Sequence, residues 1–535
     1  MHKRLLLIVL LMLPMAAFAH VGSPDVYYDG YAGPYHLLVT VRPPDVIPGV
    51  AEIQIRSASN DVNQLEIFPL RMVGPGSDPD LAPKADVAER SSADSQLFSG
   101  HLWLMDRGSW RIQVNVDGQH GKAQMAVPVP AVSMNSASMK KTLGGLLAVL
   151  GLLLVAGFIG IVGAANREAK LDPEQDLTPT HRHRGFIGMG FATALMIAVL
   201  LFGNRWWGSE ASANAKLSYR LPHLQASLQA STLQLHLENP NEAAGFTQFG
   251  TERADRLRLD DLVPDHGHVM HLFLVSNDMK SFWHLHPNQG QFAEFSEALP
   301  TMPAGHYRIF ADIVHETGFP ETEIGEIDLP AIAKKAPQDE SLCIHDHQKL
   351  LPAVANKVPK DLPLCVPDDQ KPSSSIANNG LSGDDSGEAT VSAGEKVSAL
   401  SDGYRMVWER DSAPLKTKQP LWFRFRIEDK NGNPATGLES YMGMAGHAAF
   451  IRNDGEVFAH VHPSGSVPMA AVEKVQAHNA KANSTGMDMA MNHAAPSAEV
   501  SFPYGFSQPG DYHLYVQVKR AGHVETGAFT AHVEN

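Results

Sequence analysis

The sequence predicts a mainly β protein made of three immunoglobulin-like or cupredoxin-like β-sandwich domains and two transmembrane helices. Short runs rich in β-branched and aromatic residues recur between Gly, Pro and Asn-Asp turns, which is the pattern of antiparallel strands in a sandwich. Two apolar stretches are long enough to cross a bilayer. At 535 residues the chain is also too long for one ordinary domain.

The first residues have the three regions of a secretory signal peptide. A charged start, Met-His-Lys-Arg, precedes an apolar run and the small-residue site Ala17-Phe18-Ala19. We therefore expect residues 1–19 to be removed, which leaves His20 at the mature N-terminus. A terminal histidine offers its amino nitrogen and its ring to one metal ion, so His20 is a candidate ligand. The alternative is that His20 is incidental to the cleavage site.

Residues 20–135 predict an N-terminal β-sandwich. Strand-like runs, such as residues 37–42, lead to the closing run Trp110-Arg-Ile-Gln-Val-Asn-Val, with Gly and Pro between them. The Pro-Gly before a strand and the closing Gly-x-Trp-x-Ile-x-Val resemble the periplasmic YtkA-like and FixH-like families over about residues 25–130. The resemblance implies a periplasmic sandwich, whereas a shared fold does not imply a shared function.

The terminal position of His20 is similar to that of the first histidine in the periplasmic copper-resistance CopC group and in the histidine-brace oxygenases. This resemblance rests on His20 alone. It implies a second histidine ligand, for which the sequence offers His36, His101 or His120 without a motif that chooses among them.

Two apolar stretches, residues 142–165 and 186–203, predict membrane spans. Basic residues lie both between and outside them, so the charge bias is mild. The signal peptide sets the topology: residues 20–140 are exported, residues 166–185 form a cytoplasmic loop, and the rest is exported again. We expect a protein of the inner (cytoplasmic) membrane with all folded domains on the periplasmic side.

Two later segments repeat each other around three equally spaced histidines. In each copy two apolar runs flank an Asn-Asp turn, which predicts a β-hairpin, and Asp454-Gly455 favours a two-residue type I′ turn. Opposed residues share a face with Cβ atoms roughly 4.5–5.5 Å apart, so the three rings of each copy converge. Ordinary exposed polar positions are the alternative. The two predicted metal sites lie on surface strands and consist of His271, His284 and His286, and of His447, His460 and His462.

Just before each hairpin the copies exchange one ligand type for another. An ungapped alignment places His266 and His268 where Met442 and Met444 stand. Imidazole binds both copper oxidation states and thioether favours Cu(I), so these four are predicted auxiliary ligands of copper, with zinc or nickel as other choices. Alternatively, residues 441–444 are a flexible apolar loop that fills gaps in a core.

The repeats extend to whole domains, residues 215–330 and 391–535, which the pattern predicts as sandwiches. They resemble uncharacterised envelope domains with a His-x-His-Pro signature, which implies heavy-metal handling. The linker 331–390 holds Cys343 and Cys365, which we expect to form a disulfide in an oxidising compartment. A polar insertion rich in His and Met follows the second hairpin and is predicted to be a mobile loop.

Four further histidines near the later strands are candidates for a fourth ligand: His306, His315, His513 and His523.

The composition of the chain argues against some classes of function. A net charge of -15 argues against nucleic acid as a partner. With 26 His, 20 Met and 2 Cys, metal chemistry must use imidazole and thioether, and a four-cysteine zinc site is excluded. The leading hypothesis is a non-enzymatic, membrane-anchored copper protein that sequesters copper or relays it to an exporter or to an oxidase under assembly. The alternatives are a non-metal scaffold for a membrane oxidase complex and a copper oxygenase that uses His20.

Overall fold

The computed structural model describes residues 25–238, 259–332, 389–390, 396–482 and 496–535, apart from 75, 135–139, 170, 172–175, 216–218 and 221. The predictions on the signal peptide, on His20 and on Cys343 and Cys365 therefore lie outside the described residues.

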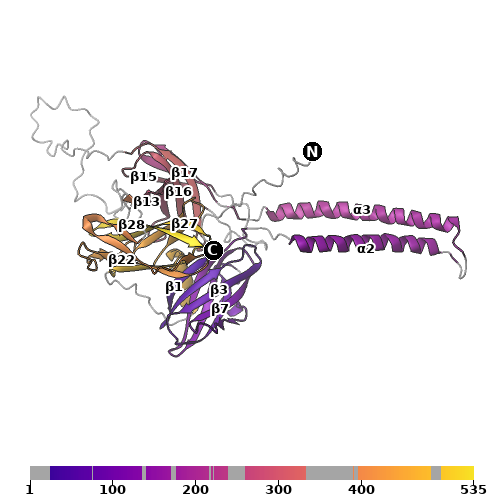
Figure 1. The fold of residues 1–535 in the computed structure, drawn as a ribbon, viewed down its shortest axis with the longest axis horizontal. Helices are drawn as coiled ribbons and strands as arrows, with labels where there is room; N and C mark the ends of the chain where they lie inside the picture. Colours follow the sequence, from indigo (N-terminus) through magenta and orange to yellow (C-terminus); the bar gives the residue numbers. More distant parts are fainter. Residues whose placement is uncertain are drawn as a thin grey trace, which may run out of the picture.

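The chain is mainly β and forms three sandwiches beside a pair of long helices, which confirms the predicted fold class (Figure 1). Each sandwich has two sheets, and alternate residues of their strands fill the space between them; in the N-terminal domain, for example, Ala51, Ile53 and Ile55 are buried.

The N-terminal sandwich pairs a sheet of order β1-β2-β3-β7-β6 with one of order β5-β4-β8-β9. The strands are β1 (Val26–Ala32), β2 (Tyr35–Arg42), β3 (Gly49–Ser57), β4 (Val62–Arg71), β5 (Asp86–Val87), β6 (Glu89–Arg90), β7 (Leu97–Leu104), β8 (Gly108–Gly118) and β9 (Gly121–Ala131), with a 3-10 turn at Pro79–Leu81.

The second sandwich, called repeat 1 below, pairs sheets of order β10-β11-β15-β14 and β17-β16-β12-β13-β18. Two residues of the predicted linker belong to it, because β18 pairs with β13. The strands are β10 (Leu224–Gln229), β11 (Thr232–Leu237), β12 (Met270–Ser276), β13 (Ser281–Leu285), β14 (Asn288–Gln289), β15 (Glu294–Ala298), β16 (Gly305–Val314), β17 (Pro320–Leu329) and β18 (Ala389–Thr390).

The third sandwich, called repeat 2, pairs a sheet of order β19-β20-β22-β26 with one of order β21-β28-β27-β24-β25, and β23 adds to β27. Its elements are β19 (Val397–Ala399), a 3-10 turn (Ser401–Gly403), β20 (Arg405–Glu409), β21 (Leu415–Lys416), β22 (Leu421–Glu428), β23 (Leu438–Glu439), β24 (His447–Arg452), β25 (Phe458–Val461), α4 (Met469–Ala482), β26 (Glu499–Tyr504), β27 (Gly510–Arg520) and β28 (His523–Glu534).

Helices α2 (Lys141–Glu168) and α3 (Pro179–Ala215) project away from the sandwiches as a hairpin (Figure 1). Both are long and apolar enough to cross a membrane. Both helices are longer than the predicted spans. The polar residues on either side of each apolar stretch are also helical, whereas the prediction counted only the apolar residues that could cross the hydrocarbon core. A Cβ added at Gly163 would lie 2.4 Å from Met189 Cγ, so this glycine permits the close approach of the two helices.

The sandwiches pack on one another. Trp422 Nε1 donates to Asp29 Oδ2 over 3.0 Å, and Asp29 N donates to Ser464 O over 2.8 Å, so strand β1 docks on repeat 2. Helix α4 begins the insertion that we predicted to be a mobile loop, and this prediction is wrong for its first part. Ala471 and Val472 pack into the core of the N-terminal domain, and this apolar contact stabilises the helix. Residues 483–495 lie outside the described part.

Candidate metal centre

The two histidine hairpins have the predicted register. Strands β12 and β13 pair Leu272 with Leu285, and β24 and β25 pair Ala448 with Val461. One step outward, this register sets His271 opposite His286 and His447 opposite His462.

The turn of the second hairpin differs from the predicted one. Gly455 N donates to Arg452 O, and Arg452 N donates to Val457 O, which makes the loop longer than two residues. A type I′ turn needs positive φ at both central residues. Here the Asn-Asp pair is central, and only Gly455 after it has a positive φ, of 73°.

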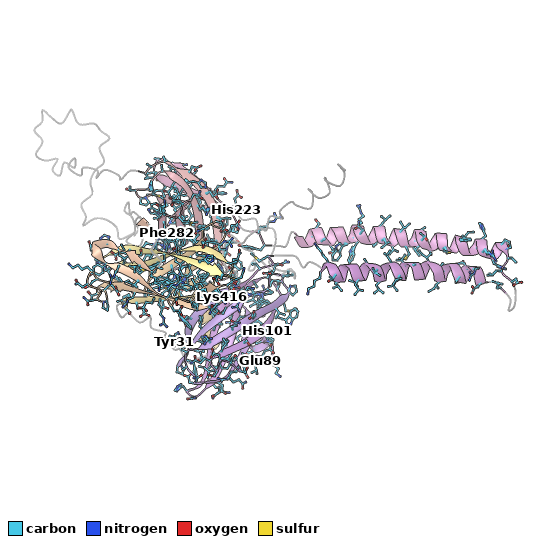
Figure 2. All side chains as sticks on the ribbon, in the orientation of Figure 1. Tyr31, Glu89, His101, His223, Phe282 and Lys416 are labelled. Atoms are coloured by element: carbon cyan, nitrogen blue, oxygen red, sulfur yellow. The ribbon has the colours of Figure 1, made fainter. Side chains whose placement is uncertain are left out.

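The histidine faces of the two hairpins lie against each other. On β12, Leu272 and Leu274 enter the core of repeat 1, whereas Phe273 and Val275 join a separate cluster with Phe458 and other residues of repeat 2. Phe282 lies where the two repeats meet (Figure 2) and stacks on Tyr515 at a ring distance of 4.3 Å. The predicted surface sites are therefore wrong in their exposure, because this aromatic contact buries the histidines.

His271, His284 and His286 form a first triad. Each offers one ring nitrogen, and these nitrogens lie within 4.8 Å of one another. All three side chains are buried. The structure thus brings together the residues of the first predicted site.

Hydrogen bonds orient two rings of the first triad. His271 Nε2 donates to the Asp265 carbonyl over 3.1 Å, and a carbonyl can only accept. His284 Nδ1 is 2.9 Å from Gln517 Oε1, and Gln517 Nε2 donates to Thr526 Oγ1 over 3.2 Å. His271 Nδ1 and His284 Nε2 face each other at 3.0 Å.

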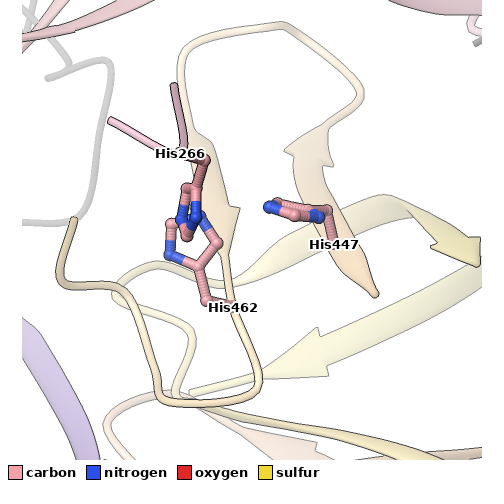
Figure 3. Close-up of side chains that lie close together, drawn as sticks. All are labelled: His266, His447 and His462. Carbon is pink, nitrogen blue, oxygen red and sulfur yellow. The ribbon is translucent and has the colours of Figure 1, made fainter. Parts of the chain in front are cut away.

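His266, His447 and His462 form a second triad, with ring nitrogens again within 4.8 Å. Figure 3 shows the rings of His266 and His462 beside each other, with His447 facing them. Both ring nitrogens of His447, and Nε2 of His266 and of His462, have no hydrogen-bond partner among the described residues. His266 takes the place in this grouping that we predicted for His460. It crosses from repeat 1 because the two sandwiches pack with their histidine faces together.

The turn that carries His266 has a counterpart in repeat 2. His266 and Gly267 have φ of 53° and 87°, and Met442 and Gly443 have φ of 50° and 80°. Each turn is closed by two reciprocal backbone hydrogen bonds. The structure therefore confirms the alignment of His266 with Met442 and of His268 with Met444. The contact shown for Met442 is through its carbonyl, which accepts a hydrogen bond from His266. Thioether binding by Met442 and Met444 stays a prediction.

His268 and His460 join the two triads into one cluster. The His268 ring stacks on His286 with centroids 4.0 Å apart. The His460 ring is 5.3 Å from His271 and 4.5 Å from His462, so it lies between the triads. Its Nδ1 is 3.3 Å from Asp312 Oδ2. The cluster contains eight histidines: His266, His268, His271, His284, His286, His447, His460 and His462.

The environment keeps four rings of the cluster neutral. Burial, followed by the neighbouring histidines, holds the pKa of His271, His284 and His447 well below the usual value of 6.5, and His462 is affected in the same way. A metal needs the unprotonated ring. These four rings are therefore available to a metal ion at neutral pH.

The four candidates for a fourth ligand have other surroundings. His306 Nδ1 is 2.9 Å from Asp328 Oδ1, His513 Nδ1 is 3.0 Å from Asn453 Oδ1, and His523 is exposed. His315 lies between two carboxylates, 2.7 Å from Asp261 Oδ1 and 3.0 Å from Glu321 Oε2. Burial alone would lower the pKa of His315, but these hydrogen bonds raise it to about 9.

Of the predicted partners for His20, His36 lies 2.7 Å from Asp29, His120 lies 3.6 Å from Asp61, and His101 is exposed.

Sequence reasoning missed four residues that support the cluster. Gln517 and the Tyr441 hydroxyl both contact His284 from the other repeat, the latter at 3.2 Å. Asp265 accepts from the Ala470 backbone N–H as well as from His271, and Asp312 lies beside His460. These contacts join distant segments, so no local spacing could have revealed them.

Comparisons with known proteins give little further information. A family described as a domain of unknown function (DUF8832) matches residues 227–323 and 397–535, which contain both hairpins. No curated protein matches the chain significantly.

Some solved structures show a weak likeness. An engineered protein has 9% identity over 18% of this chain and 20% of its own, with a TM-score of 0.14, so the match spans about a fifth of that chain. The PmoD soluble domain from Methylocystis sp. ATCC 49242 (Rockwell) has 18% identity over 19% of this chain and 96% of its own, with a TM-score of 0.15. A putative membrane anchored protein from Corynebacterium diphtheriae has 9% identity over 96% of both chains, with a TM-score of 0.14. Likeness at these scores carries no argument about function.

Proposed function

We propose that this chain is a membrane-anchored envelope protein that binds copper in the buried histidine cluster, one ion in each triad. It sequesters the metal or passes it to an exporter or to an oxidase under assembly. The domains lie on the periplasmic side, and α2 and α3 hold them at the inner membrane.

One observation carries this proposal: each triad brings three histidine ring nitrogens within 4.8 Å of one another, and in the buried first triad His271 Nδ1 and His284 Nε2 are 3.0 Å apart. Imidazole nitrogens bind Zn²⁺ at about 2.0–2.1 Å, so ligand nitrogens around one ion of this kind stand roughly 3 Å apart. The geometry fits a shared metal ion.

The choice of copper rests on the donor set. Both triads consist of neutral imidazoles, which suit copper, zinc and nickel. Copper(II) binds most tightly in the divalent series, and Met442 beside the second triad adds a residue type that favours Cu(I). Because the triads are buried, we expect a bound ion to dissociate slowly. Sequestration therefore has more support than rapid exchange of the metal.

The test is a copper titration of the full chain, purified in detergent, with Cu(I) supplied from a chromophoric chelator. The wild type should bind two ions. His284→Ala with His286→Ala should lose one ion, and His447→Ala with His462→Ala should lose the other. The matched control, His36→Ala with His120→Ala in the N-terminal domain, should still bind two. Zn²⁺, Ni²⁺ and Cu²⁺ titrations run in parallel decide the metal. A wild type that binds none of these ions would refute the proposal.

A further inference from the structure

A cavity of about 210 Å³ lies where the three sandwiches meet. At its inner end are His271 of the first triad, His462 of the second triad and His460 between them. At its outer end is Asp45, an exposed residue of the N-terminal domain. The cavity therefore joins the surface to both triads.

The walls of the cavity come from all three sandwiches. Pro44 and Pro130 line it from the N-terminal domain, Phe319 from repeat 1 and Ala471 from helix α4 of repeat 2. Proline has a fixed φ and no backbone N–H, so this part of the wall is stiff and offers few polar groups that could retain an ion.

Five carboxylates that could attract a cation line the cavity: Asp25, Asp45, Asp265, Asp312 and Glu321. Asp45 supplies a carboxylate at the mouth. Inside, Asp312 Oδ2 is 3.3 Å from His460 Nδ1, and Thr322 Oγ1 donates to Asp312 Oδ1 over 2.6 Å, which fixes the carboxylate. His460 Nε2 is buried and has no hydrogen-bond partner among the described residues. A negative mouth raises the local concentration of cations.

We propose that this cavity is the route by which a soft or borderline transition-metal cation reaches both triads. Asp312 and His460 line this route beside the two triads. Because His460 lies near a member of each triad, one route serves both. The inference rests on the proposed function, since it assumes that the triads bind metal.

The test blocks the mouth without touching a ligand. Asp45→Cys is made in a full chain that also carries Cys343→Ser and Cys365→Ser, and the new thiol is labelled with a bulky maleimide. Lys84→Cys, exposed on the same domain but outside the cavity, is labelled as the matched control. Stopped-flow absorbance follows transfer of Cu(I) from a chromophoric chelator, and an endpoint titration gives the number of ions bound.

We expect the label at position 45 to slow loading about tenfold or more, with the final number of ions unchanged, and the label at position 84 to have no effect. A smaller change gives a second test. Asp45→Lys should slow loading at low salt and less so at high salt, because exposed charges are screened, whereas Asp45→Glu should load at the wild-type rate.

Equal loading rates for the chain labelled at position 45 and the unlabelled chain would overturn the route while leaving the proposed function intact. Failure of the unlabelled chain to take up copper would refute the proposed function itself.

Discussion

Replacing His447 by leucine should stabilise the metal-free protein and weaken the metal-loaded one. His447 is 1% exposed, and neither ring nitrogen has a hydrogen-bond partner among the described residues. A buried polar group left unpaired costs about 1–3 kcal/mol. Leucine is similar in volume and has no polar atom, so His447→Leu should raise the free energy of unfolding without metal by about 1–3 kcal/mol. In a domain of this size that raises the unfolding midpoint by about 2–4 °C per kcal/mol.

With copper bound, the wild type should be more stable than His447→Leu. A ligand at about 100 times its Kd stabilises the folded state by about 2.7 kcal/mol per site. The wild type gains this at both triads, whereas His447→Leu gains it only at the first. Thermal unfolding of the full chain, with and without Cu(I), measures both effects. His306→Leu, at a half-exposed position outside the cluster, should stay within about 0.5 kcal/mol of the wild type. The reasoning is refuted if His447→Leu is less stable than the wild type without copper, or if copper stabilises both chains equally.

Two further predictions test the packing of the cluster and its surroundings. His266→Ala should lose the copper ion of the second triad, although the residue belongs to repeat 1. A titration that still finds two ions would contradict a second triad shared between the two repeats. His306→Ala is the control and should still bind two ions. Glu323 is buried, and burial together with the Glu321 carboxylate raises its pKa to about 9 from 4.5. The folded chain therefore keeps a proton between pH 4.5 and 9 that the unfolded chain has lost, so the free energy of unfolding falls as the pH rises through this window, by about 2 kcal/mol between pH 7 and 9. Glu323→Gln should remove the contribution of Glu323 to this loss of unfolding free energy, whereas the contribution of His315 stays. Urea midpoints at pH 7 and 9 measure the difference between the two chains. An equal loss of stability in both chains would show that Glu323 is ionised in the folded protein.

One sign of burial was readable in the sequence. The strand face that carries His271 also carries Phe273, and the face that carries His460 also carries Phe458. Large aromatic side chains on the same face as polar ones indicate that the face meets another surface. The repeated histidine spacing suggested exposed ligands, whereas the adjacent phenylalanines favoured contact between the repeats.

The sequence by itself determined the strands, the hairpin register and the two apolar helices. Side chains alternate along a strand with a period of two, so the spacing of His284 and His286 already places them on one face. A bilayer-length apolar run likewise identifies a helix that could cross a membrane without any other part of the chain.

Only the tertiary structure decided which histidines form a triad. His266 joins His447 and His462, and Gln517 orients His284, because two sandwiches pack through a shared aromatic contact. That contact depends on the shapes of whole sheet faces separated by long stretches of chain. Local spacing does not encode such shapes, so the same histidines were assigned to two separate hairpins until the faces were brought together.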